Sequence, residues 1–205
     1  SVNLLLVYGN SDQIYGFSCY GIILGSMFQA YKSGHEFGNL ALRVAEKFHN
    51  KAEITKAANI VANYTLPFRE HLKNASEINK KCLEAGRESG EFQHISYSLI
   101  FNALNSFYLG KNLSFILNEI IPRNILLCKQ AKSSLGIDSI SALRIVLLSM
   151  SSSVEDKMEL EVIRDYEEKF LIEWKKNNNY FTVFIYKTLK ICNCFIQENY
   201  SEAYT

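Results

Sequence analysis

No charge of one sign predominates in this sequence. Its 22 lysine and arginine residues are almost balanced by 21 aspartate and glutamate residues, which leaves a net charge of +1. A protein that binds the phosphate backbone of a nucleic acid needs a clustered positive face. The sequence therefore argues against nucleic acid as a partner. Its hydrophobic content of 48% also excludes an intrinsically disordered chain.

The cysteines lack the even number and regular spacing of a disulfide framework. All five lie in apolar stretches, which predicts buried reduced thiols and indicates the cytosol: Cys19, Cys82, Cys128, Cys192 and Cys194. The last two are two positions apart, so they do not face each other on a helix. No second cysteine pair completes a zinc site, and we expect both side chains to pack in the core.

Long uninterrupted hydrophobic runs are also missing. Residues 2–7 are too short a run for a membrane span and lack the features of a signal peptide, so we interpret them as the end of a helix. Residues 180–196 are apolar too, but Lys187, Lys190 and Asn193 interrupt them, at a depth where charge is costly in lipid. This block is predicted to be a buried helix, and the chain to be cytoplasmic with no membrane partner.

What the sequence does contain is a series of apolar and amphipathic helices separated by glycine turns about every 40 residues, a spacing typical of helical repeats. Residues 11–30 are apolar almost all round, which predicts a helix inside the array. Ser11 and Asp12 can cap its first turn. The predicted pairs are 11–30 with 35–49, 52–66 with 68–88, and 92–109 with 112–132.

Two prolines mark features of these pairs. Pro67 stands at the join of the second pair, and Pro122 is predicted to kink its helix near Ile120. The regular pairs thus occupy about 11–132. We expect irregular helices over about 136–176, among them a short helix 140–150 and a long charged helix 154–176, before a further repeat starts in 180–205.

These patterns predict an all-α fold: a single helical-repeat domain, 1–205, forming a right-handed α-solenoid of antiparallel, tetratricopeptide-like helix pairs. Terminal repeats normally end in a polar cap, so the last helix needs a neighbour on its far side. Its apolar residues are Phe181, Phe184, Ile185, Leu189 and Phe195. We therefore expect a fragment of a longer protein, or a homodimer formed through the 180–205 edge.

Several short motifs resemble the helical-repeat region of large bacterial multi-domain sensor kinases. They are Tyr8-Gly9-Asn10-Ser11, Gly34-x2-Phe37-Gly38-x-Leu40-Ala41-Leu42, Leu83-Glu84-Ala85-Gly86-Arg87-Glu88-Ser89-Gly90-Glu91-Phe92 and Phe107-Tyr108-Leu109-Gly110-Lys111. In that family a serine/threonine kinase-like domain and an AAA-type ATPase module precede the repeats, and a GAF sensor and a histidine kinase follow. The resemblance implies a non-enzymatic scaffold that binds protein and couples the ATPase module to the downstream domains in signal transduction.

No kinase or ATPase motif lies in the chain itself. It has no Gly-x4-Gly-Lys-Ser/Thr phosphate loop, no His-Arg-Asp catalytic loop and no glycine-rich loop after a strand. We therefore predict no catalytic residue, no cofactor and no enzyme activity for this segment. The predicted partner is protein, either neighbouring domains of the same chain or another signalling protein.

Two Glu-x-x-His motifs offer a catalytic alternative. Glu46 with His49, and Glu91 with His94, match the spacing that di-iron carboxylate bundles use. Both motifs stand beside turns, which favours polar helix ends over a metal site. A helical metalloprotein built on these four residues, and an inducer-sensing repeat domain of a transcription regulator, stay as alternatives to the scaffold. His35 and His71 are predicted to be capping or surface groups.

Aromatic residues make up 13% of the chain. On the inner helices they could form a protein-binding stripe, whose candidates are Tyr15, Tyr20, Tyr97, Phe101 and Tyr108. Most rings in helical repeats pack between adjacent pairs, so core packing is favoured for them. Any ring left exposed on the concave side is a candidate binding residue, because aromatic side chains are enriched in interface hot spots.

Overall fold

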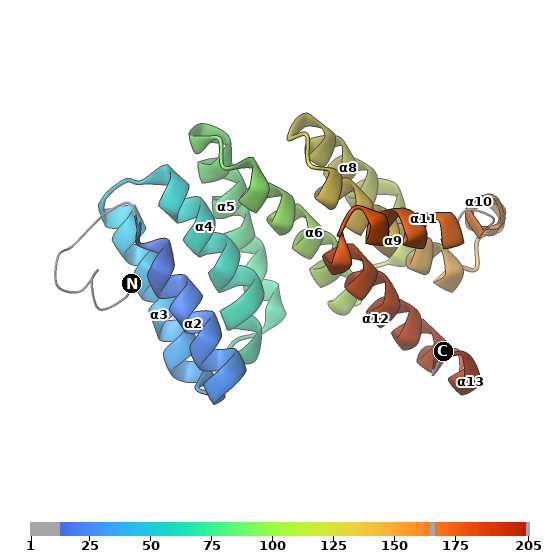
Figure 1. Cartoon of the computed structure of the whole chain (residues 1–205), viewed down its shortest axis with the longest axis horizontal. Coiled ribbons are helices and arrows are strands. Elements are labelled where there is room, and N and C mark those ends of the chain that lie inside the picture. Colours follow the sequence, from blue (N-terminus) through green and yellow to red (C-terminus); the bar gives the residue numbers. More distant parts are fainter. Residues whose placement is uncertain (1–12, 165–166, 204–205) are drawn as a thin grey trace. The chain divides into compact units, whose positions relative to one another are not determined.

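The structure is a computed structural model of the chain and describes residues 13–164 and 167–203. Every regular element among these residues is helical, and no strand occurs there. The fold is therefore all-α, as predicted, and neighbouring helices pack against each other (Figure 1). The helix end expected at 2–7, the motif at 8–11 and the expected cap at Ser11 and Asp12 lie outside the described residues. Within these ranges, no helix has the length and apolar character needed to cross a membrane.

The chain divides into two compact units, Ser1–Asn105 and Ser106–Thr205, a division that the single domain predicted for 1–205 did not include. The described helices of the first unit are α2 (Tyr15–Phe28), α3 (Tyr31–Lys47), α4 (Lys51–Ile60), α5 (Ala75–Ser89) and the greater part of α6 (Phe92–Tyr108). Those of the second are α7 (Leu113–Phe115), α8 (Ile121–Gln130), α9 (Ser134–Met150), α10 (Val154–Arg164), α11 (Glu167–Lys176), α12 (Tyr180–Ile196) and α13 (Tyr200–Ala203).

Helices α2 and α3 form an antiparallel pair that approaches closely at two glycines. A Cβ atom added to Gly21 would lie 2.4 Å from the carbonyl oxygen of Gly34, so no larger residue fits there without moving the backbone. The expectation that residues 11–30 lie inside the array does not hold for the end of α2, within the described residues 13–30. Helix α2 packs mainly on α3 and α4 through one face, and Met27 and Phe28 at its end are exposed.

The second predicted pair differs from the sequence expectation at its join. Helix α4 continues through a π-helical turn, η2 (Val61–Thr65), and a 3-10 turn, η3 (Leu66–Phe68), that contains Pro67. The helix expected over 68–88 begins only at Ala75. The reason is His71, whose backbone is extended and whose ring Nδ1 accepts a hydrogen bond from the Lys73 N–H at 3.1 Å, which caps a short 3-10 turn, η4 (Leu72–Asn74).

Helices α4 and α6 of the first unit run parallel, because residue numbers rise in the same direction along both helices at their contacts. The side chain of Asn59 donates a hydrogen bond to the Ser98 hydroxyl at 3.0 Å, and Lys56, one turn earlier in α4, lies near Glu91, which directly precedes α6. Ser98 in turn contacts Cys82 of α5 at 3.0 Å. Burial raises the pKa of the Cys82 thiol to about 11, against the effect of this hydrogen bond, so the thiol stays protonated.

All five cysteines are free thiols, in agreement with the absence of a disulfide framework. Cys82, Cys128 and Cys194 are buried, whereas Cys19 and Cys192 are half-buried. Cys192 and Cys194 lie in α12. The predicted core packing is therefore confirmed for Cys194, whereas Cys192 is only half-buried.

In the second unit, the kink expected near Ile120 coincides with a π-helical turn, η5 (Ile116–Ile120), directly before Pro122 in α8. Helix α9 is longer than the predicted 140–150, because Ser133 caps it by accepting a hydrogen bond from the Gly136 N–H at 3.1 Å. The predicted helix 154–176 corresponds to α10 and α11, and its continuity falls on residues 165–166, outside the described residues.

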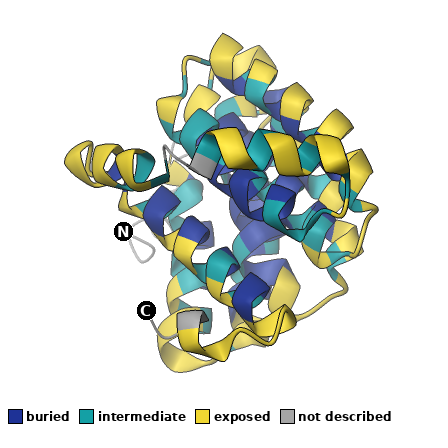
Figure 2. Cartoon of the chain, turned by 90° about the vertical axis from the view of Figure 1, so that its right-hand side faces the viewer, coloured by how far each residue is buried: buried dark blue, intermediate teal, exposed yellow. Residues whose placement is uncertain are grey.

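Helices α9 and α12 run parallel and form the centre of the second unit. Ser139 and Thr182 share a hydrogen bond of 2.7 Å near their starts, and Asn193 donates to the Ser149 hydroxyl at 2.8 Å near their ends. Each packs antiparallel to a neighbour, since Arg144 of α9 pairs with Glu159 of α10, and Tyr186 of α12 lies beside Trp174 of α11. Helix α9 is buried or half-buried along nearly its whole length, whereas buried and exposed residues alternate along α12. Figure 2 colours the chain by burial.

Candidate functional site

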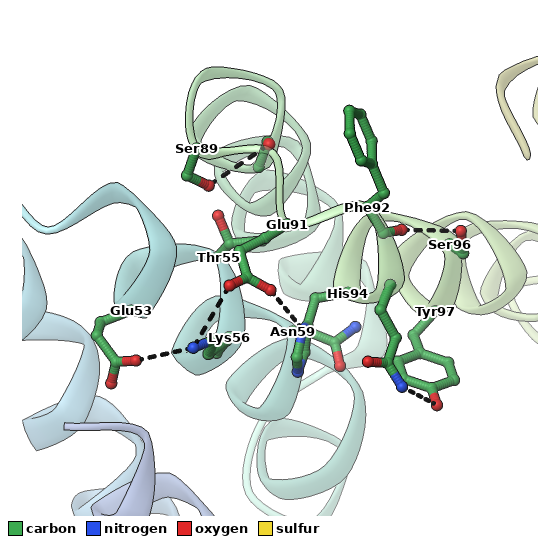
Figure 3. A network of polar contacts seen from close by, with 12 residues as sticks. Glu53, Thr55, Lys56, Asn59, Ser89, Glu91, Phe92, His94, Ser96 and Tyr97 are labelled. Carbon is green, nitrogen blue, oxygen red and sulfur yellow. Dashed lines mark hydrogen bonds and ion pairs between the residues drawn. The ribbon is translucent and has the colours of Figure 1, made fainter. Parts of the chain in front are cut away.

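A charged network joins the starts of α2, α4 and α6 in the first unit (Figure 3). Its centre is Glu53, in the first turn of α4, which is only 2% exposed. One carboxylate oxygen accepts a hydrogen bond of 2.5 Å from the Tyr15 N–H, the first backbone donor of α2, and the other lies 3.1 Å from Lys56 Nζ. A carboxylate suits this place because the start of a helix carries partial positive charge.

Lys56 connects this carboxylate to α6. Its ammonium lies 3.4 Å from Glu91 Oε1, and Glu91 Oε2 lies 3.4 Å from His94 Nδ1 (Figure 3). Burial lowers the pKa of Lys56, but the hydrogen bonds and charges of its two carboxylate neighbours outweigh burial and raise it. The lysine therefore stays charged and balances the buried glutamate, as a buried charge requires.

His94 is buried among apolar and aromatic groups. Burial lowers the pKa of its imidazole more than Glu91 raises it, so the ring is neutral at pH 7. The contact of its Nδ1 with Glu91 does not have the geometry of a hydrogen bond, and this nitrogen has no other hydrogen-bond partner among the described residues. The network as a whole fixes the starts of three helices.

The four metal candidates do not form one site. Glu46 pairs with Lys81 of α5, and His49 is exposed in a left-handed backbone conformation (φ 52°) after the end of α3. Only Glu91 and His94 lie together. Among residues 13–164 and 167–203, no group of three or more histidine, cysteine, aspartate or glutamate side chains could hold a metal ion.

The five aromatic candidates divide into packed rings and one exposed ring. Tyr15 and Tyr97 contact His94 edge-on at centroid distances of 5.5 and 6.1 Å. Tyr20 packs on Phe37 at 5.0 Å, and Phe101 on Tyr64 at 5.2 Å. Tyr108 is exposed. Burial, helped by a hydrogen bond with Cys19, raises the pKa of the Tyr15 phenol above its usual value, so that group is not acidic.

The two other histidines also have structural roles. His71 caps η4, as predicted. His35 is not a surface group, which corrects the prediction: it is buried and contacts Thr65, Glu70 and Asn39 at 3.3, 3.2 and 2.9 Å. Asn39 is one turn away in the same helix, whereas Thr65 and Glu70 come from the turns after α4. The sequence alone does not show that these turns reach His35.

The strongest candidate for a functional surface is the outward side of α12. We call it the α12 outer face, formed by Tyr180, Phe184, Lys187, Ile191 and Phe195, which recur every three or four residues and are all exposed. Phe184 is 67% and Phe195 is 65% exposed. The opposite side of the same helix is buried, with Ile185 and Leu189 in the core.

The sequence predicts that this helix needs a neighbour on its far side but does not separate its two faces. Of the residues on which that prediction rests, Ile185 and Leu189 are already covered, whereas Phe184 and Phe195 are not. Lys187 interrupts the apolar run in the sequence. In the structure it lies in the middle of the α12 outer face. Its spacing of three residues from Phe184 places both side chains on the same side of the helix.

Comparisons of the chain with known protein families, with curated proteins and with solved structures found no match. The surface and its chemistry therefore carry the functional conclusion.

Proposed function

We propose that this chain is a non-enzymatic protein-interaction domain, a tetratricopeptide-like right-handed solenoid that couples an ATPase module to the sensor and histidine kinase domains of a cytoplasmic signalling kinase. The helix order supports this proposal. Helices α4 and α6 are parallel in the first unit, and α9 and α12 are parallel in the second, as corresponding helices are in a solenoid of stacked pairs. The motif resemblance described above supports the parentage.

The observation that carries the proposal is the α12 outer face. A helix that is apolar all round is normally buried all round, yet α12 is covered on one side only. Exposed phenylalanine and tyrosine side chains in a row, such as Phe184 and Phe195, offer a large apolar contact area with few rotatable bonds. A row of exposed apolar side chains around one charged residue is typical of a protein-docking surface.

The charge on this face selects the kind of occupant. Lys187 is exposed at the centre of the stripe, with Phe184 and Ile191 on either side. In a symmetric pair of α12 helices that overlap along their full length, parallel or antiparallel, the central positions of the two copies meet. Two lysine ammonium groups would then face each other, and like charges oppose such an interface. We therefore favour a segment of different sequence over a second copy.

The proposed partner is an amphipathic helix, from a neighbouring domain or another signalling protein. It carries apolar residues at three-and-four spacing and an acidic residue opposite Lys187. Stacked helix pairs transmit relative rotation through their packed interfaces, so a partner on this face can shift the populations of states elsewhere in the same protein.

Site-specific photo-crosslinking in cells that produce the native protein tests the proposal. Phe184 is replaced by p-benzoyl-phenylalanine, and the same replacement at Phe115, an exposed phenylalanine of α7, is the matched control. We expect Phe184 to crosslink to one segment that mass spectrometry identifies as an amphipathic helix with a central acidic residue, and Phe115 not to do so. Equal labelling from both positions, or a crosslink only to a second copy of this chain, would overturn the proposal.

A further inference from the structure

A cavity of about 210 Å³ lies among α9, α10, α11 and α12 in the second unit. One wall is apolar and is formed by Ile145, Val146 and Leu160. Polar groups come from α12, among them Lys190 and Asn193. They lie outside the α12 outer face. Most of the lining is polar, and the apolar wall is its smaller part. A few fixed polar groups are what orients a ligand in a small-molecule site.

The hydrogen bonds around Ser149 fix the orientation of the Asn193 amide. The Ser149 hydroxyl donates to the Val146 carbonyl at 2.6 Å, so its single proton is used. The Ser149 oxygen must then accept from Asn193, and the amide nitrogen lies 2.8 Å from it. Exchanging the nitrogen and oxygen of the amide would place two acceptors together, so the carbonyl oxygen Oδ1 points away from Ser149.

That carbonyl oxygen has no hydrogen-bond partner among the described residues, although Asn193 is only 7% exposed. Buried polar atoms in folded proteins almost always have a partner. The cavity that Asn193 lines is where a donor can reach this oxygen.

The charged groups of the cavity compensate each other. Lys190 Nζ lies 2.8 Å from Glu167 Oε1, and the Tyr186 hydroxyl donates a hydrogen bond to the same oxygen. Lys190 also lies over the Tyr186 ring, 5.8 Å from its centroid. A charged ligand would have to break this pair. The acceptor that is left over is a neutral amide, which suits an uncharged ligand.

We propose that this cavity binds an uncharged small molecule that donates an N–H or O–H group to Asn193 Oδ1 and rests its apolar part on Ile145, Val146 and Leu160. The cavity volume is about the volume that seven water molecules occupy in the liquid. A ligand of this size has roughly ten non-hydrogen atoms. This site is separate from the docking surface, because Phe184 and Asn193 lie on different faces of α12.

Indole and benzofuran are a matched pair of probes for this site. They share size and shape, but only indole has an N–H donor. Titration of the full chain is followed by two-dimensional NMR and by the thermal unfolding midpoint. We expect indole to bind saturably and benzofuran to bind about tenfold more weakly, since it leaves the amide oxygen unpaired.

Two variants complete the test. Leu160→Trp fills the cavity from a half-buried position of α10 and should abolish binding of both probes while circular dichroism stays that of the folded chain. Asn193→Leu should remove the preference for indole. If neither probe binds the folded wild-type chain, or both bind equally well, the cavity is not the proposed site.

Discussion

The close approach of α2 and α3 provides a stability prediction whose sign can be worked out in advance. In Gly21→Ala, the new Cβ would lie 2.4 Å from the backbone oxygen of Gly34, a rigid atom that no side-chain rotation can move away. The helices must separate by about 1 Å to restore an ordinary contact, and such overpacking costs about 3 kcal/mol. Alanine favours a helix over glycine by about 1 kcal/mol. We expect a net loss of about 2 kcal/mol.

Gly25→Ala, one turn later in the same helix, is the matched control. Its nearest new neighbour would be the Tyr31 ring at 3.6 Å, an ordinary van der Waals contact, so only the helix preference remains. We expect a gain of up to about 1 kcal/mol. Urea unfolding followed by far-UV circular dichroism measures both free energies. Equal effects of the two substitutions would refute the glycine contact between α2 and α3.

Other predictions concern the buried polar groups of the first unit. Asn63 and Asn79 hydrogen-bond each other reciprocally at 3.0 Å, so Asn63→Leu should cost about 2 kcal/mol in urea unfolding, and the double change to leucine should cost less than twice that. Glu53→Gln should cost about 1–2 kcal/mol, whereas Glu88→Gln, in an exposed ion pair, should change the unfolding free energy by less than about 0.5 kcal/mol. Burial lowers the pKa of His94, so the unfolded chain takes up its proton first. Stability should be constant above about pH 6.5 and fall as the pH drops below it, and His94→Gln should reduce that fall.

The helices themselves could be predicted from the sequence, because apolar residues at three-and-four spacing mark each of them. The surroundings of a polar side chain could not be predicted in this way. Glu53 stands in a predicted helix, but its bond to the Tyr15 N–H joins residues 38 positions apart. His35 likewise contacts Glu70 through a turn whose geometry depends on the π-helical end of α4.

The exposed end of α2 and the two faces of α12 illustrate a second limit. Apolar content showed that both helices need extensive cover, but it did not show how much cover the chain provides. Met27 and Phe184 have the same residue character as core side chains, yet both are exposed in the structure. The structure thus adds the information that makes α12 a candidate surface.

Isothermal titration calorimetry shows most directly whether this chain binds protein through the α12 outer face. The titrant is a synthetic peptide covering the segment crosslinked from Phe184. We predict that Phe184→Ala weakens binding by about 2 kcal/mol, roughly 30-fold in Kd, and that Phe115→Ala leaves Kd unchanged. An unchanged Kd for Phe184→Ala in a folded chain would show that the α12 outer face is not the docking surface.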